Sequence, residues 1–286
     1  MKKAAVVIFT VLFGFLLFLG AAKPCAARQA GYIFDVQGDA KLKTVDGKTF
    51  RLKRDEHLLH AIEEGDIIRV TKGKVVIAVL KENVGYEIRD NSEGIAKDGR
   101  IVAIRGKVSE LEGLHAPGRV ATGSMGGFVV RSVRPCIRAI SPVSTTIIEL
   151  TPELAWENKC PGDKTVTVRI MAGDTVLFST QSENNSLTVP ENVLAFGHKY
   201  RWVVDSGKAK NVSSGFFSVP SESEVKKIIK KIDQFREHRQ DLSFRLSYVF
   251  FLIDNDLNEM AKEQVKALRS DFPGNRYITQ VEESIR

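Results

Sequence analysis

Residues 35–92 read DVQGDAKLKTVDGKTFRLKRDEHLLHAIEEGDIIRVTKGKVVIAVLKENVGYEIRDNS, and this stretch decides the fold of the N-terminal part. Short β-rich runs alternate in it with turn-forming residues. Asp46-Gly47 between two alternating runs indicates a hairpin. No run shows helical periodicity longer than two turns, so residues 31–136 are predicted to form an all-β domain. Its strands are expected over residues 33–36, 41–44, 49–52, 67–70, 75–80 and 86–89, with strand-rich sequence at 101–108 and 128–133.

The same stretch resembles the periplasmic sensor domain of the FecR family. That domain typically shows V-x-G, then a hydrophobic-x-x-G-D-x-I step, a run of alternating apolar residues and a final polar Ser. The matching residues are Val36, Gly38, Ile62, Gly65, Asp66, Ile68, Val75, Ile77, Val79, Ile88 and Ser92. The family usually has an Asp-Gly turn where this chain has Glu82-Asn83-Val84-Gly85, which is a departure. The resemblance implies the fold more than a function, because such domains occur in signalling regulators and in other envelope proteins.

Residues 137–220 are strand-rich in a different way, with short runs spaced by about 8–14 residues. Seven short strands at this spacing are typical of a β-sandwich. Their order resembles an immunoglobulin/fibronectin III-like module, in which Trp156 is the buried core indole. Tyr200 and Trp202 are two residues apart on one strand, so we expect both to point to the same face, into the core.

The β-character stops at Ser221, and residues 221–286 are predicted to be helical. Ser221-Glu222-Ser223-Glu224 is a capping-box signature, and apolar residues follow from Val225 at helical spacing. Further helices are expected over residues 242–253 and 257–270, and Asn275 is expected to cap a last short helix. Residues 245–275 resemble one tetratricopeptide repeat, although Asn255-Asp256 replaces the small residue usual in its turn. The chain as a whole is thus predicted to be a multidomain, mainly β protein with a small helical C-terminal module.

The second of these helices is more apolar than one helical hairpin can cover. A stripe of about three apolar residues per heptad is enough to face one core. Two interpretations remain open: the helix from Val225 covers this surface, or Tyr248, Phe250 and Phe251 line a site for self-association or a partner. The apolar residues are Leu246, Val249, Phe250, Phe251, Leu252 and Ile253.

Residues 1–27, MKKAAVVIFTVLFGFLLFLGAAKPCAA, predict export from the cytoplasm. Lys2 and Lys3 precede 19 uncharged residues at positions 4–22, and small residues follow. We expect a signal peptide that is cut after Ala27, with Ala22 as a second position. The alternative is an uncleaved inner-membrane anchor, because 19 residues form about 28 Å of helix, close to the hydrocarbon thickness of a bilayer. Both place the bulk of the chain in the periplasm or outside the cell.

Two cysteines remain after such a cut, Cys136 and Cys160. In an oxidising compartment an even pair predicts one disulfide. Cys136 precedes the first expected sandwich strand and Cys160 follows the second, so antiparallel pairing of these strands would bring the two cysteines together.

The distribution of charge bears on the partners. The net charge falls from +7 to about +4 once Lys2, Lys3 and Lys23 leave with the leader. Between residues 97 and 138, eight basic residues accompany three acidic ones, which could attract an anionic envelope polymer or lipid headgroups. Nucleic acid is not expected, because the basic residues lack the interleaved aromatics of a stacking platform.

No motif supports catalysis, a metal or a cofactor. His57 and His60 are spaced i, i+3, whereas a helical zinc pair needs i, i+4. Residues 118–124 lack the Lys of a phosphate loop, and Ser124 misses the GxSxG pattern by one residue. We therefore expect a non-catalytic envelope protein that binds or scaffolds a protein partner or an envelope glycan. The alternatives are an extracytoplasmic sensor half with a separate transducer and, third, an enzyme.

Overall fold

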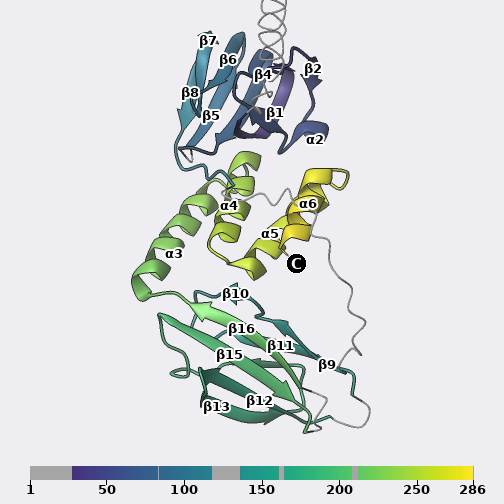
Figure 1. Ribbon diagram of the computed structural model, residues 1–286, viewed down its shortest axis with the longest axis vertical. Coiled ribbons are helices and arrows are strands. Elements are labelled where there is room, and N and C mark those ends of the chain that lie inside the picture. Colours follow the sequence, from purple (N-terminus) through teal and green to yellow (C-terminus); the bar gives the residue numbers. More distant parts are fainter. Residues whose placement is uncertain (1–27, 83, 118–135, 161–163, 208–211, 286) are drawn as a thin grey trace, which may run out of the picture.

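The computed structural model describes residues 28–82, 84–117, 136–160, 164–207 and 212–285. The chain is mainly β with a C-terminal set of helices, as predicted. Along the long axis, these helices lie between an N-terminal β part and a second β part (Figure 1). The leader, its cleavage positions and the expected strand at 128–133 lie outside the described residues.

The N-terminal β part is one eight-stranded sheet, in which the paired strands run antiparallel. The predicted hairpin at Asp46-Gly47 is confirmed, because the Thr44 amide donates to the Lys48 carbonyl oxygen at 2.8 Å. The elements of this part are β1 (Gln29–Lys43), β2 (Thr49–Leu52), α2 (Arg54–His57), β3 (Ala61–Glu63), β4 (Ile67–Val79), β5 (Val84–Arg89), β6 (Ser92–Lys97), β7 (Arg100–Arg105) and β8 (Val108–Leu111).

Strands β1 and β4 are each a single strand where the sequence predicted two. Paired glycines let their backbones approach closely at the point between the predicted strands. Gly38 faces Gly73 in the β1–β4 ladder, and both have a positive φ, of 87° and 96°. A Cβ on Gly73 would lie 2.0 Å from the Gln37 carbonyl oxygen, and one on Gly38 would lie 2.2 Å from that of Lys72. Lys72-Gly73, which separates two of the predicted strands, therefore lies inside β4, where glycine marks a close approach of two backbones.

The long strands β1 and β4 belong to two halves of the sheet that share one apolar core. The first half contains β2, the C-terminal part of β1, the N-terminal part of β4, β6 and β7. The second half contains β3, the remaining parts of β1 and β4, β5 and β8. Leu42 and Ile68 from the first half pack in the same core as Ile33 and Ile77 from the second half.

Four helices follow at the predicted places. Ser221 and Glu224 form the predicted capping box, and the Asn275 side chain accepts the backbone amides of Tyr277 and Ile278 as the predicted cap. The helices are α3 (Glu222–Glu237), α4 (Leu242–Asp254), α5 (Asn258–Asp271) and α6 (Arg276–Ser284).

The apolar surface of α4 is covered within the chain. Phe250 and Phe251 are 3% and 8% exposed. Helix α3 supplies part of the cover, because Phe235 lies against Phe251 with a ring separation of 5.6 Å. The N-terminal sheet supplies another part, because Phe34 of β1 stacks on Phe250 at 5.8 Å. Of the two interpretations left open, the structure shows the first for Phe250 and Phe251, which are covered within the chain, and Tyr248 is half-buried against Phe235.

The second β part consists of two sheets that share one core. One sheet has the strand order β10-β16-β15-β12-β13, and the other has the order β14-β11-β9. Trp156, Tyr200 and Trp202 are buried in this core, as predicted. The strands are β9 (Ile137–Ser141), β10 (Thr145–Thr146), β11 (Glu153–Asn158), β12 (Val166–Ala172), β13 (Thr175–Ser182), β14 (Ser186–Thr188), β15 (His198–Asp205) and β16 (Val212–Val219).

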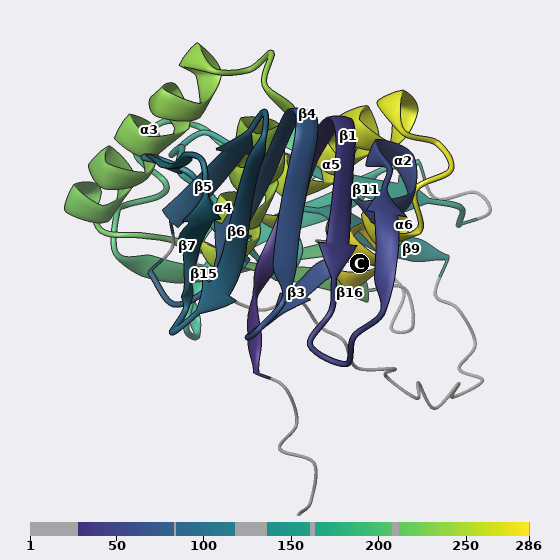
Figure 2. The ribbon, with the colours of Figure 1, turned by 90° about the horizontal axis from the view of Figure 1, so that it is seen from above.

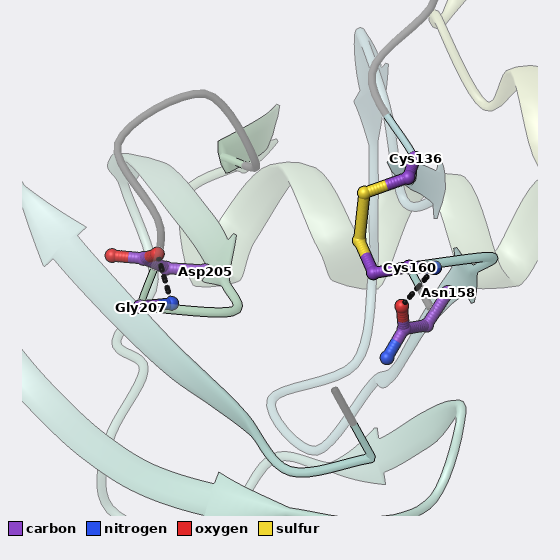
Figure 3. Close-up of a disulfide and its surroundings, with 5 residues drawn as sticks. All are labelled: Cys136, Asn158, Cys160, Asp205 and Gly207. Atoms are coloured by element: carbon purple, nitrogen blue, oxygen red, sulfur yellow. Dashed lines mark hydrogen bonds between the residues drawn. A yellow bond between two sulfur atoms is a disulfide. The ribbon is translucent and has the colours of Figure 1, made fainter. Parts of the chain in front are cut away.

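The predicted disulfide between Cys136 and Cys160 is confirmed (Figure 3). Strands β9 and β11 pair antiparallel with Asn158 opposite Ile137, and the two cysteine Cα atoms lie 4.8 Å apart. The Asn158 side chain accepts the Cys160 amide at 3.0 Å, which holds this end of β11 (Figure 3). A disulfide fits an extracytoplasmic protein, because such bonds persist in oxidising compartments.

Reduction of this disulfide is expected to lower the free energy of unfolding by about 3 kcal/mol, because the bond closes a loop of about 25 residues in the unfolded chain. Urea denaturation with and without reductant measures the loss, and intact mass after alkylation reports the state of the thiols. The double variant Cys136→Ser/Cys160→Ser should match the reduced protein. Equal stability of the oxidised and reduced proteins would contradict a stabilising role.

Candidate functional site

The polar residues that match the FecR motif bond to the backbone. Asp66 is 1% exposed, and its carboxylate accepts the amides of Val45 and Glu63, both at 2.9 Å. The buried Ser92 hydroxyl accepts the Lys107 amide at 3.0 Å and donates to the Asp90 carbonyl oxygen at 3.2 Å. These motif residues therefore hold turns of the sheet in place and do not present a ligand site.

The histidines that the sequence singled out pack against aromatic rings. His57 stacks on Phe50, and the His57 and His60 rings lie 5.7 Å apart. Burial, followed by the nearby charge of His57, lowers the pKa of His60. Within the described residues, no group of three or more His, Cys, Asp or Glu side chains could hold a metal ion. Residues 118–124, including Ser124, lie outside the described part.

The turn between α4 and α5 bonds to the second β part. The Asp256 carbonyl oxygen accepts the Thr146 amide at 2.8 Å and the Thr145 hydroxyl at 2.9 Å. The Asn258 side chain donates to the Ser144 carbonyl oxygen at 3.0 Å. Asp256 takes a positive φ of 56°. Asn255-Asp256, which departs from the tetratricopeptide pattern, is thus the segment that fixes the helices to β10.

The helices bond to the N-terminal β part as well, through α2 and the segment that follows β8. The Asn275 side-chain amide donates to the Asp55 carbonyl oxygen at 3.0 Å, in addition to capping α6. Lys231 of α3 donates to the Gly113 carbonyl oxygen at 3.0 Å. His115 Nε2 lies 2.7 Å from the Asp254 carboxylate at the end of α4. The helical layer therefore connects the two β parts.

One face of the N-terminal sheet points away from this helical layer. The helices pack on the outer side of the second half, against Tyr32, Phe34, Val76 and Ala78. The outer side of the first half carries two rows of side chains. Each row consists of directly paired residues, one from each of β2, β1, β4, β6 and β7 in that order. We call these ten residues the open face: Thr49, Lys43, Ile67, Ile95 and Val102 in one row, and Arg51, Lys41, Arg69, Glu93 and Arg105 in the other.

The open face is strongly basic, with five cationic side chains and one carboxylate. Arg69 pairs with Glu93 at 2.7 Å, and Arg51 pairs with Asp39 at 3.0 Å. Lys41, Lys43 and Arg105 have no ion-pair partner in the part of the chain that the structure describes. Such an excess of one sign creates a potential that attracts anions.

Exposed aliphatic side chains lie among and beside these charges. Val102 of the open face is 45% exposed, Ile104 of the same strand is 52% exposed, and Val45, which follows Lys43 of the open face, is 55% exposed. Val45 lies beside Gly65, at the end of the sheet where the Glu64 amide bonds to the Arg28 carbonyl oxygen at 2.8 Å. The arrangement suits binding of an anionic surface, since it combines charge with apolar contact.

Sequence reasoning placed the basic excess at residues 97–138 and missed most of the open face. Of its five basic residues only Arg105 falls in that range, because the others come from three different strands. The alternation Lys41-Leu42-Lys43 was the available signal, since it turns both lysines to one side of a strand. Which strands lie beside them follows only from the pairing register.

No protein-family model matches the chain, and no curated protein matches it. The resemblances to the FecR, immunoglobulin/fibronectin III and tetratricopeptide families accordingly stay predictions. None of the described helices is both long and apolar enough to cross a bilayer.

Proposed function

We propose that the protein is a non-catalytic binding or scaffold protein of the periplasm, and that the open face is its binding surface. The observation that carries the proposal is the row of Arg51, Lys41, Arg69 and Arg105 across neighbouring strands, broken only by Glu93. The helical layer fixes this sheet to the second β part, which suits a scaffold that presents surfaces at separate places. The partners that we propose are an anionic envelope component at the open face and an envelope protein elsewhere.

The finer fold assignments belong to the same proposal. For the second β part, we propose an immunoglobulin/fibronectin III-like sandwich. The Tyr200 hydroxyl donates to the Ala195 carbonyl oxygen at 3.2 Å and accepts the Ala195 amide at 2.8 Å. A tyrosine that bonds back to the backbone in this way is a hallmark of such sandwiches. For the N-terminal sheet we propose a FecR-like domain, supported by the Gly65-Asp66 turn at the matching place.

Photo-crosslinking in living cells tests the binding surface. A photoreactive residue in place of Thr49, which lies on the open face, is expected to give adducts with envelope components. The same residue in place of Thr175, an exposed threonine of β13, is the matched control and should not give these adducts. Identical adducts at both positions, or none at Thr49, would overturn the assignment of the binding surface.

A reporter fusion tests the compartment separately. Alkaline phosphatase fused to the C-terminus should be active, because that enzyme needs the disulfides that form outside the cytoplasm. An inactive phosphatase together with an active cytoplasmic reporter would refute the periplasmic location.

A further inference from the structure

We infer that the open face binds the surface of an anionic lipid bilayer. The inference rests on the proposed function, since it names the ligand of the binding surface proposed above. Two features of the molecule support it, the charge of the open face and the aliphatic side chains on and beside it. A third, its position relative to the N-terminal residues, applies to the form with an uncleaved anchor.

The charge of the open face fits anionic lipid headgroups. Lys41 and Lys43 of β1 and Arg105 of β7 lie on the same side of one sheet, with β4 and β6 between them, and have no ion-pair partner among the described residues. Unpaired cations on one side of a sheet suit a layer of phosphate groups, and basic side chains near such a layer contribute additively to binding. Glu93 does not oppose this attraction by itself, because Arg69 pairs with it at 2.7 Å.

The aliphatic residues favour a bilayer over a water-soluble polyanion. Val102, Ile104 and Val45 are each at least 45% exposed, on or beside the open face. A hydrated glycan would leave these side chains in water. A bilayer accepts them at the boundary between headgroups and acyl chains, where basic and apolar groups on one surface bind together.

In the form with an uncleaved anchor, the open face lies near the membrane. Arg28, the first described residue, bonds to Glu64 beside Gly65 and Val45. Only residues 23–27 separate Arg28 from the uncharged segment 4–22. Five extended residues span at most about 18 Å. If segment 4–22 stays in the membrane, this end of the sheet is therefore held close to the bilayer surface. Figure 2 shows the strands of this sheet in front of the helices. The helical layer therefore does not lie between the open face and a bilayer on that side.

Tryptophan fluorescence with brominated lipids tests the inference. The variant Val102→Trp adds an indole to the open face, and Ile229→Trp adds one to α3, where the native side chain is 43% exposed. The native Trp156 and Trp202 are buried in the second β part and give a constant background. Each variant is purified in the N-terminal form that the cell makes. It is then combined with vesicles of phosphatidylglycerol and phosphatidylcholine brominated on the acyl chains, and circular dichroism verifies its fold.

We expect the vesicles to quench the indole of the Val102→Trp variant at least twofold more than that of the Ile229→Trp variant, and vesicles of phosphatidylcholine alone to quench neither. Lys41→Gln/Lys43→Gln in the Val102→Trp background should raise the lipid concentration for half-maximal quenching about 30-fold, the loss expected for two basic side chains near an anionic surface. Lys227→Gln/Lys230→Gln on α3 removes the same charge and should leave that concentration unchanged.

Two results would overturn the inference, and they differ in what they leave standing. In the first, the vesicles quench the Val102→Trp variant no more than the Ile229→Trp variant, while dextran sulfate binds and Lys41→Gln/Lys43→Gln weakens that binding. This result would assign the open face to a polyanion, and the proposed binding surface would stand without its lipid ligand. In the second, neither the vesicles nor dextran sulfate distinguishes the open-face variants from the α3 controls, and the binding surface itself is wrong.

Discussion

Replacing Phe250 by alanine is expected to lower the free energy of unfolding by about 3–5 kcal/mol, the usual loss for a buried phenylalanine. Phe250 is 3% exposed, and its ring stacks on Phe34 of the N-terminal sheet at 5.8 Å. Phe34→Ala should cost a similar amount for the same reason. Urea denaturation followed by circular dichroism measures both losses.

The double variant Phe34→Ala/Phe250→Ala tests whether the helices and the sheet share a core. Side chains in contact show coupling energies of about 0.5–3 kcal/mol in a double-mutant cycle. Phe216→Ala is the matched control, because Phe216 is 54% exposed on β16 and its loss should be small. Strict additivity of the Phe34 and Phe250 losses would show that the helices fold independently of the N-terminal sheet.

The elements that the sequence predicted well carry local signals. The capping box at Ser221, the cap at Asn275 and the turn at Asp46-Gly47 each need only a few neighbouring residues, and the structure contains all three. The disulfide was predictable because Cys136 and Cys160 flank two strands that are close in sequence, and only two cysteines follow the leader.

The packing of helices on the N-terminal sheet joins residues more than 200 positions apart, so no local signal describes it. A signal was nevertheless present in the strands. Val75, Val76, Ile77, Ala78 and Val79 are all apolar, and all are at most 1% exposed. A strand that is apolar in both phases is buried on both faces. An interpretation based only on the alternate residues Val75, Ile77 and Val79 describes one face of the strand. It leaves out Val76 and Ala78, which need a covering layer on the other face.

The open face could not be predicted from the sequence for a related reason. Its rows exist because β1 and β4 continue through Gly38 and Gly73, which places Lys41 beside Arg69 and Lys43 beside Ile67. The sequence analysis predicted two strands in place of each of these, separated at the glycine, because glycine next to polar residues ordinarily marks a turn. Only the pairing of the two backbones at close distance shows that these glycines lie within strands.

Replacing Gly73 by alanine is expected to cost more than about 4 kcal/mol, a loss that single substitutions rarely reach. The new Cβ would lie 2.0 Å from the Gln37 carbonyl oxygen, so the β1–β4 ladder would have to open at this point. Gly47→Ala is the matched control. Gly47 has a similar φ of 88°, and nothing lies within 4 Å of its added Cβ, so only the backbone strain of about 1–2 kcal/mol remains.

Urea denaturation of the two variants separates the steric clash from the backbone strain that both share. If Gly73→Ala does not fold, its susceptibility to limited proteolysis at native temperature, compared with that of Gly47→Ala, gives the same ranking. The ladder that opens at Gly73 is also the one that aligns the rows of the open face, so a folded Gly73→Ala protein should bind phosphatidylglycerol vesicles more weakly than Gly47→Ala. Equal stability of the two variants would show that the backbones of β1 and β4 do not approach closely at Gly38 and Gly73. The strand register that defines the open face would then be wrong as well.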